Sequence, residues 1–163
     1  GCGNGYYSEI LLYLTSFYFW YIGLDFSKAM IDSASARYPD LSFLQGSALE
    51  IPMGNKSIDI VWSGTVLMHL LDYRKAITEA CRIARRFCVF HSTPLVIYGS
   101  TMYLKKKAYG AIVPEVLIAK DEFENLVRQQ GFKINHILES LPYQAGNLVD
   151  AELATLTYVC ERV

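Results

Sequence analysis

The sequence carries almost no net charge. Its 163 residues include 15 lysines and arginines and 16 aspartates and glutamates, which gives a formal net charge of −1 at pH 7. A nucleic-acid-binding domain usually presents a concentrated positive field, and this balance offers none. The one basic run, at residues 105–107, is short, and we expect it to lie on the solvated face of a helix. We therefore predict no nucleic-acid partner.

Cysteine and histidine are also few, and their spacing is not that of a metal site. None of the four cysteines forms a C-x-x-C pair, and the three histidines complete no zinc pattern, so we predict no metal. Cys81, Cys88 and Cys160 lie in apolar stretches, where a thiol usually acts as a small hydrophobic side chain. This usage fits a reducing cytosol, so we predict a cytoplasmic location.

No apolar run in the sequence is long enough to span a bilayer. The most apolar stretch, residues 10–24, has 15 residues between Glu9 and Asp25, whereas a spanning helix needs about 20. The stretch also has no basic flank and no small-residue cleavage site, which argues against a signal peptide. We expect a buried helix that leads into a buried strand, and no association with a membrane.

Apolar residues, in contrast, are abundant, at 52% of the sequence. This composition and length predict one packed domain over residues 1–163. Helix-like and strand-like patterns alternate, which predicts an α/β fold around a mostly parallel sheet. Helices are expected at residues 8–16, 27–38, 72–86, 101–110 and 119–130, and strands at residues 19–24, 41–45, 58–63, 87–91, 132–138 and 155–162.

A glycine-rich loop opens the sequence and leads directly into a predicted helix. Gly1, Gly3 and Gly5 form a G-x-G-x-G pattern, in which a ligand can approach the backbone without meeting a Cβ atom. Alone, the pattern is equally typical of an ordinary glycine-rich turn. Asp25 lies 20 residues after Gly5, at the end of the next predicted strand. An acidic residue there binds ribose hydroxyls in nucleotide-binding α/β domains, although it could also cap the following helix.

The spacing of the glycines distinguishes two classes of nucleotide ligand. A dinucleotide-binding loop has the pattern G-x-G-x-x-G, and its third glycine would fall at Tyr6 of this sequence. A tyrosine there would obstruct the close approach of a pyrophosphate. S-adenosylmethionine has no pyrophosphate, so the tighter loop favours it over a nicotinamide dinucleotide.

Four segments, in order, resemble the class I S-adenosylmethionine-dependent methyltransferases that act on small molecules. They are GCGNGYYSEI, YIGLDFSKAMIDSA, FLQGSALEIPMGNKSIDIVWSGTVLMHL and FENLVRQQGFKI, and together the resemblance covers nearly the whole sequence. It implies a Rossmann-like, doubly wound sheet with helices on both faces and an antiparallel last strand. It also implies methyl transfer from S-adenosylmethionine to a small-molecule acceptor.

The same resemblance implies a role for each residue that matches a family motif. The loop would line the methionine part of the cofactor, Asp25 would bind the ribose hydroxyls, and Phe26 would lie against the adenine. Ser47, where many relatives have aspartate, and Ala48 would meet the adenine edge, unless they form only a turn. Ser63 and Gly64 would touch the methionine or sulfonium end. The predicted cofactor-binding residues are thus Gly1, Cys2, Gly3, Gly5, Asp25, Phe26, Ser47, Ala48, Ser63 and Gly64.

Two departures from the family pattern stand out. Relatives have a strand before the glycine loop, and we expect this sequence to lack that first strand. Relatives also have a Pro-Gly-Gly turn before the fifth strand, and this sequence has Arg85, Arg86 and Phe87 there. An inactive or partner-dependent fragment that binds S-adenosylmethionine is therefore the alternative to an active enzyme.

Methyl transfer from a sulfonium needs no nucleophile or metal from the protein. The cofactor carries the reactivity, and the protein supplies position and a dry site. A general base helps only where the acceptor must lose a proton. His69, after the fourth strand of the family pattern, is the candidate base, although a packing role would also explain it, and His91 is the weaker alternative. The acceptor and the oligomeric state are left open.

Overall fold

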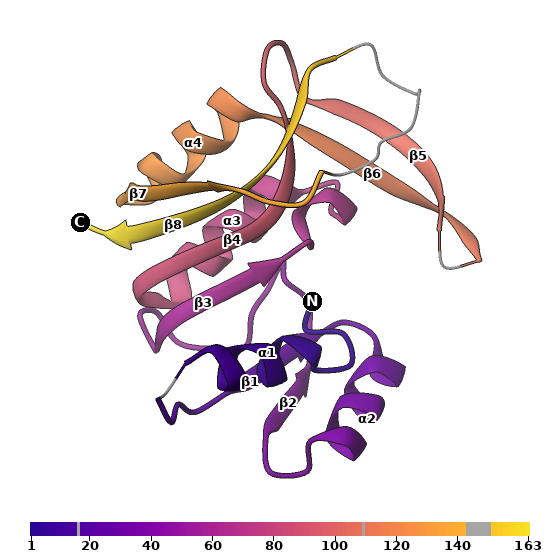
Figure 1. Cartoon of the computed structure of the whole chain (residues 1–163), viewed down its shortest axis with the longest axis vertical. Helices are drawn as coiled ribbons and strands as arrows, with labels where there is room; N and C mark the ends of the chain where they lie inside the picture. The colour runs from indigo at the N-terminus through magenta and orange to yellow at the C-terminus, as the bar shows by residue number, and fades with distance from the viewer. Residues whose placement is uncertain (16, 109, 143–150) are drawn as a thin grey trace. The chain divides into compact units, whose positions relative to one another are not determined.

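The computed structural model describes residues 1–15, 17–108, 110–142 and 151–163. The chain divides into two units, Gly1–Pro52 and Met53–Val163 (Figure 1). The prediction of one domain over residues 1–163 stays a prediction. Within the described ranges, every helix falls short of the length and apolar character that a bilayer crossing requires.

The N-terminal unit is a two-stranded parallel sheet with two short helices. Its elements are α1 (Tyr6–Leu14), β1 (Ile22–Asp25), α2 (Lys28–Arg37) and β2 (Ser42–Gln45), with β1 and β2 in parallel register. Ser27 caps α2, as predicted, because its side chain accepts a hydrogen bond from the amide of Met30. Glu9 links the helices, since its Oε2 accepts from the Tyr38 hydroxyl at 2.6 Å.

Gly23 in β1 is needed for the packing of this small sheet. A Cβ atom at this position would lie 2.5 Å from the Phe43 ring of β2, which is closer than real Cβ atoms come to other atoms. The close approach of backbone and ring therefore depends on glycine.

The expected burial of the apolar stretch at residues 10–24 is wrong for several of its large side chains, although others are half-buried. Tyr13 at the end of α1 is 88% exposed, and Tyr18 and Trp20, which precede β1, are 103% and 101% exposed. Both strands of this unit are only four residues long. So small a sheet provides too little surface to cover these side chains.

The C-terminal unit is built around a six-stranded mixed sheet. Its elements are β3 (Ile58–Gly64), the 3-10 helix η1 (Leu67–His69), α3 (Tyr73–Ile83), β4 (Ala84–Val96), β5 (Met102–Ala108), β6 (Ala111–Ala119), α4 (Lys120–Gln129), β7 (Phe132–Glu139) and β8 (Leu153–Arg162). The order is β5-β6-β4-β8-β7, with β3 also paired to β4 (Figure 1).

Strand β4 is the centre of this sheet. Along one edge it pairs in parallel, with β3 over residues 84–91 and with β6 at Leu95 and Val96. Along the other edge it pairs with β8 in the antiparallel direction, and β8 pairs in turn with β7. The last strand is thus antiparallel to its neighbours, as predicted, but β5–β6 is an additional antiparallel pair.

An aromatic cluster forms the core between the sheet and α4. Phe90 of β4 meets Phe123 of α4 edge-to-face at 5.3 Å between ring centroids, and Phe123 lies 4.8 Å from the Tyr158 ring of β8. All three side chains are at most 1% exposed. The Tyr158 hydroxyl donates to Glu124 Oε1 at 3.1 Å, so its polar end is satisfied inside the core.

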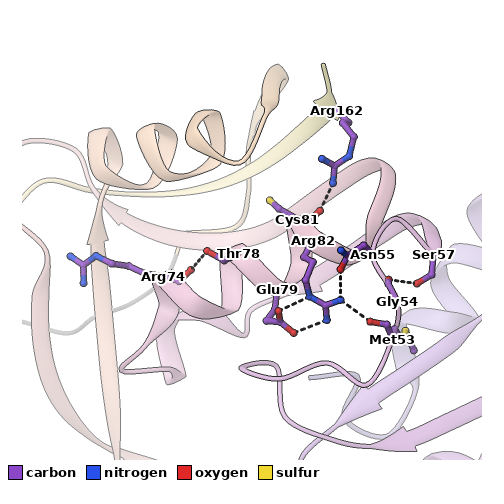
Figure 2. A network of polar contacts seen from close by, with 10 residues as sticks. All are labelled: Met53, Gly54, Asn55, Ser57, Arg74, Thr78, Glu79, Cys81, Arg82 and Arg162. Carbon is purple, nitrogen blue, oxygen red and sulfur yellow. Dashed lines mark hydrogen bonds and ion pairs between the residues drawn. The ribbon is translucent and has the colours of Figure 1, made fainter.

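Arg82 of α3 ties this helix to the segment that precedes β3 (Figure 2). Its guanidinium contacts both oxygens of Glu79 at 2.7 and 2.8 Å. It also donates to the Met53 carbonyl at 2.7 Å and to Asn55 Oδ1 at 3.0 Å. The planar group therefore fixes three neighbours at once, in the geometry for which arginine is suited.

The predicted helix over residues 101–110 is wrong, and the strand at β6 was missed. Residues Met102–Ala108 form β5, which pairs with β6 as a hairpin. The side chains of β5 alternate, with Met102 and Leu104 half-buried and Tyr103 and Lys105 exposed. This period of two is that of a strand, so the basic run lies on a strand and not on a helix.

Candidate functional site

The glycine loop before α1 adopts a backbone conformation that requires glycine. Gly3 and Gly5 have φ values of +54° and +84°, in the left-handed region. A Cβ atom at Gly5 would also lie 2.9 Å from the Tyr38 ring, whereas one at Gly3 would meet nothing within 4 Å. The turn is closed by the Gly5 amide, which donates to the Cys2 carbonyl at 3.0 Å.

The buried carboxylate of Asp25 holds this loop at the carboxyl end of β1. Asp25 is 7% exposed. Its Oδ2 accepts from the Gly3 amide at 2.8 Å, and its Oδ1 accepts from the Ser27 amide at 2.9 Å. A backbone hydrogen bond also joins the loop to β1, because the Cys2 amide donates to the Leu24 carbonyl at 2.9 Å. Each carboxylate oxygen has a second lone pair, so the group can accept further hydrogen bonds.

Phe26, Ser47 and Ala48 lie at the same edge of the N-terminal sheet, because Asp25 and Gln45 are register partners. Phe26 is 79% exposed, and Ala48 is half-buried. The amide of Gly46 donates to the Asp25 carbonyl at 2.9 Å. Ser47 Oγ accepts from the Leu49 amide at 3.1 Å, so part of its hydrogen-bonding capacity stabilises a turn.

Ser63 and Gly64 end β3 in the C-terminal unit, where both are half-buried. Thr65 follows with φ of +58°, and its amide donates to the His91 carbonyl at 3.0 Å. His69 lies a few residues further on, in η1, and is also half-buried. The structure thus brings the first eight predicted cofactor residues together in one unit and places the last two, with His69, in the other.

Sequence reasoning missed a polar cluster around His91. His91 Nδ1 lies 2.9 Å from Thr157 Oγ1, and Thr157 Oγ1 lies 2.7 Å from Ser140 Oγ. Burial lowers the pKa of His91 below its ordinary value of 6.5. The position of His91 at the end of a predicted strand made it a candidate site residue. No sequence motif includes Thr157 or Ser140.

The part of the chain that the structure describes contains no group of three or more histidine, cysteine, aspartate or glutamate side chains placed to hold a metal ion. Cys81, Cys88 and Cys160 are buried as free thiols, and Cys81 Sγ lies 4.0 Å from Cys88 Sγ.

The two units define a class of protein: a Rossmann-like α/β fold with a glycine loop and a buried acid at the end of the next strand. A family model described as "Methyltransferase domain" matches residues 1–90, more than half of the chain. The chain therefore belongs to this family, the class I S-adenosylmethionine-dependent methyltransferases. The predicted family and fold class are confirmed, whereas the absence of a first strand stays a prediction.

Relatives of known description support this assignment. The chain is 34% identical over 95 residues to a "Probable S-adenosylmethionine-dependent methyltransferase" of Mycolicibacterium smegmatis. This match covers 58% of this chain and 36% of that protein. It is 33% identical over 122 residues to the demethylmenaquinone methyltransferase of Oceanobacillus iheyensis, and this match covers 69% of this chain and 51% of that protein. The chain thus spans between about a third and a half of the length of these relatives.

Solved structures show the same fold at low sequence identity. An S-adenosylmethionine-dependent methyltransferase from Methanosarcina mazei has a TM-score of 0.74 and 15% identity, and the match covers 100% of this chain and 90% of that one. Magnesium protoporphyrin IX methyltransferase from Synechocystis, solved with bound S-adenosylmethionine, has a TM-score of 0.70 and 16% identity. That match covers 100% of this chain and 67% of the other.

Proposed function

We propose that the chain binds S-adenosylmethionine and transfers its methyl group to a small-molecule acceptor. The observation that carries this proposal is the Asp25 carboxylate, which is buried at the carboxyl end of β1 and held by two main-chain amides. A buried charge is costly unless hydrogen bonds compensate it. The two amides compensate part of this cost, and the remaining lone pairs match the two adjacent hydroxyls of a ribose.

The residues around Asp25 fit the rest of an adenosine. Gly1, Gly3 and Gly5 offer backbone without a Cβ atom, and we assign Cys2 between them to the same part of the cofactor. The exposed ring of Phe26 offers a surface on which adenine could stack. Ser47 Oγ can accept a second hydrogen bond, from the adenine amine, in addition to the one from Leu49. We assign Ala48 to the adenine edge.

In the C-terminal unit, we assign Ser63 and Gly64 to the methionine end, at the carboxyl end of β3, where ligands of open α/β sheets bind. When bound, S-adenosylmethionine supplies an electrophilic methyl group on a sulfonium. The protein orients the acceptor, excludes water and, where the acceptor carries a proton, removes it. His69 is one candidate for that last task.

The acceptor class rests on the relatives. One is named demethylmenaquinone methyltransferase, and a Penicillium expansum relative, 27% identical over 119 residues, is named O-methyltransferase. A small molecule is the acceptor that these names favour for this chain. The free buried thiols fit a reducing compartment, and a cytoplasmic location is part of the proposal.

Calorimetric titration with S-adenosylmethionine tests this function. We expect binding by the wild-type chain and a loss of at least about tenfold in affinity in the Asp25→Ala variant, because charge-assisted hydrogen bonds to the ribose contribute roughly 1.5–3 kcal/mol each. Asp32→Ala is the matched control: Asp32 is an exposed acid of the same unit, in α2, paired with Lys28. Its removal should leave the affinity unchanged.

A ligand analogue separates the ribose role of Asp25 from its role in holding the loop. The wild-type chain should bind S-adenosylhomocysteine more tightly than its 2′-deoxy analogue, and Asp25→Ala should bind the two alike. Equal binding of the two ligands by the wild-type chain would remove the ribose assignment. Binding without turnover on any quinol or phenol acceptor would favour the alternative of an inactive or partner-dependent fragment.

A further inference from the structure

The β5–β6 hairpin extends beyond the rest of the sheet in the C-terminal unit (Figure 1). Only Ile118 and Ala119, at the end of β6, pair with β4, whereas residues 102–108 and 111–117 pair with each other. Side chains alternate along each strand, and residues opposite each other in register share a face. The hairpin therefore has two faces, and their compositions differ.

The inner face is apolar and carries the acidic charge of the hairpin. Met102 and Leu104 are half-buried and pack against a core cluster that contains Leu117. Glu115 lies on the same face and is 1% exposed, with its Oε1 at 3.9 Å from Lys106 Nζ. The carboxylate thus faces away from bulk solvent, and the middle lysine of the basic run lies beside it.

The outer face has lysines and no carboxylate. It consists of Tyr103, Lys105 and Lys107 of β5 and their register partners Val116, Pro114 and Ile112 of β6. Val116, at the base of the hairpin, is buried, but Lys105 and Lys107 are exposed. Neither lysine forms an ion pair with a described residue, whereas most other lysines and arginines of the chain do. Their positive charge is therefore available to an anionic partner.

An exposed aliphatic side chain lies directly beside these lysines. Ile112 is 75% exposed and is the register partner of Lys107. Lys105 is two residues further along the same face, or about 7 Å away. Cations next to an exposed aliphatic side chain match the interface of a bilayer, where anionic headgroups lie above the acyl chains.

We propose that the outer face of the hairpin docks the chain on a membrane surface that contains anionic lipids. Lys105 and Lys107 contact the headgroup phosphates, and Ile112 enters the boundary between headgroups and acyl chains. This contact is peripheral and does not depend on the proposed methyl transfer. It revises our expectation of no membrane association, which was based on the lack of a spanning segment and a signal peptide.

Nucleic acid is the other common anionic surface, and the hairpin suits it less well. Phosphates would accept hydrogen bonds from the lysines, but a sugar–phosphate backbone gives Ile112 no apolar layer to enter. A net charge of −1 also provides no wider positive field around the hairpin.

Sedimentation of the whole chain with lipid vesicles tests the role of the lysines. We expect binding to vesicles of equal parts phosphatidylcholine and phosphatidylglycerol to exceed binding to phosphatidylcholine alone by at least about tenfold. Each lysine near such a surface strengthens binding roughly fivefold, so Lys105→Gln/Lys107→Gln should lower the partition coefficient at least about tenfold. Lys56→Gln/Lys75→Gln is the matched control, since these lysines are exposed in the same unit, and less than about a twofold change is expected.

A second pair of variants tests the insertion of the aliphatic side chain. Ile112→Ser should weaken binding to the mixed vesicles roughly threefold or more, and this loss should persist in high salt, which weakens only the contribution of the lysines. Leu138→Ser is the control: Leu138 is 54% exposed on β7, at the opposite edge of the described sheet, and its replacement should leave binding unchanged. Each exchange alters an exposed side chain, so circular dichroism should show all variants folded.

Several outcomes would overturn the proposal. Equal binding of the wild-type chain to neutral and mixed vesicles, or binding to neither, would remove the anionic surface as the partner. Unchanged vesicle binding by Lys105→Gln/Lys107→Gln, together with self-association of that variant, would show that the lysines only prevent pairing at the β5 edge. Binding of the wild-type chain to a DNA duplex but not to vesicles would assign the outer face to nucleic acid.

Discussion

The two units of this chain hold their proposed site residues by different means. In the N-terminal unit, the amides of Gly3 and Ser27, 22 and 2 residues away in sequence, hold Asp25. In the C-terminal unit, the imidazole of His91 is held by Thr157, 66 residues further along the chain. The first arrangement depends on the glycine loop and on the short parallel pair β1–β2. The second requires the correct register between β4 and β8.

The units also differ in how much core they possess. The strands of the N-terminal unit have four residues each, and three aromatic side chains before β1, those of Phe17, Tyr18 and Trp20, are exposed. In the C-terminal unit, β4 has 13 residues and carries part of the buried Phe90–Phe123–Tyr158 cluster. Packing should therefore dominate the stability of the second unit, and backbone geometry that of the first.

The largest expected effect is on this aromatic core. Phe123→Ala should lower the free energy of unfolding by about 3–5 kcal/mol, because a fully buried ring is replaced by a cavity. Urea denaturation followed by circular dichroism would measure it. Phe17→Ala removes a ring that is 77% exposed and should cost less than about 0.5 kcal/mol. Similar losses for the two variants would contradict the contrast in core packing.

The next effect concerns the glycine loop. Gly5→Ala should destabilise the chain by about 2 kcal/mol, because it combines a positive φ with a Cβ contact at 2.9 Å to Tyr38. Gly3→Ala shares the positive φ but meets open space, so about 1 kcal/mol is expected. Thermal unfolding of both variants would test the order. A larger loss at Gly3 would show that steric contact is not what fixes this loop.

The smallest effect concerns a polar anchor of the C-terminal unit. Arg82→Ala should lower the midpoint of urea denaturation by a small, measurable amount, because it removes the hydrogen bonds from Arg82 to Glu79, Met53 and Asn55 at once. Arg85, whose exposed side chain pairs only loosely with Asp59 at 3.3 Å, is the control, and Arg85→Ala should cost less than about 0.5 kcal/mol. Denaturant midpoints with unchanged slopes would measure both, and equal costs would show that the Arg82 contacts add nothing.

Features that depend on neighbours in sequence were predictable. The cap at Ser27, the helix after it and the strand that ends at Asp25 were correctly predicted, because capping and short apolar runs are local signals. The helix predicted at residues 101–110 was wrong. Three consecutive lysines show no apolar–polar alternation, and the segment is a strand because it pairs with β6. Burial at Tyr18 and Trp20 was also mispredicted, because burial depends on tertiary structure.

The same distinction applies to the candidate site. The glycine loop and Asp25 could be selected from spacing alone, and their cofactor roles remain predictions. The polar cluster around His91 could not be found, because Thr157, which contacts the ring, and Ser140, which contacts Thr157, acquire their place through the register of β8 and the end of β7. Serine and threonine at such positions carry no pattern that distinguishes them from ordinary strand residues.

Strand β8 has a consequence for how the chain is made. It lies between β4 and β7, so both of its edges are paired, yet it is the last strand of the described sheet to be synthesised. On the ribosome, β3, α3 and β4 can associate early, while the β8 edge of β4 waits for residues more than 50 positions later. The sheet can close only after residues 153–162 have been synthesised and have left the ribosome, and until then the β8 edge of β4 is unpaired and open to non-native contacts.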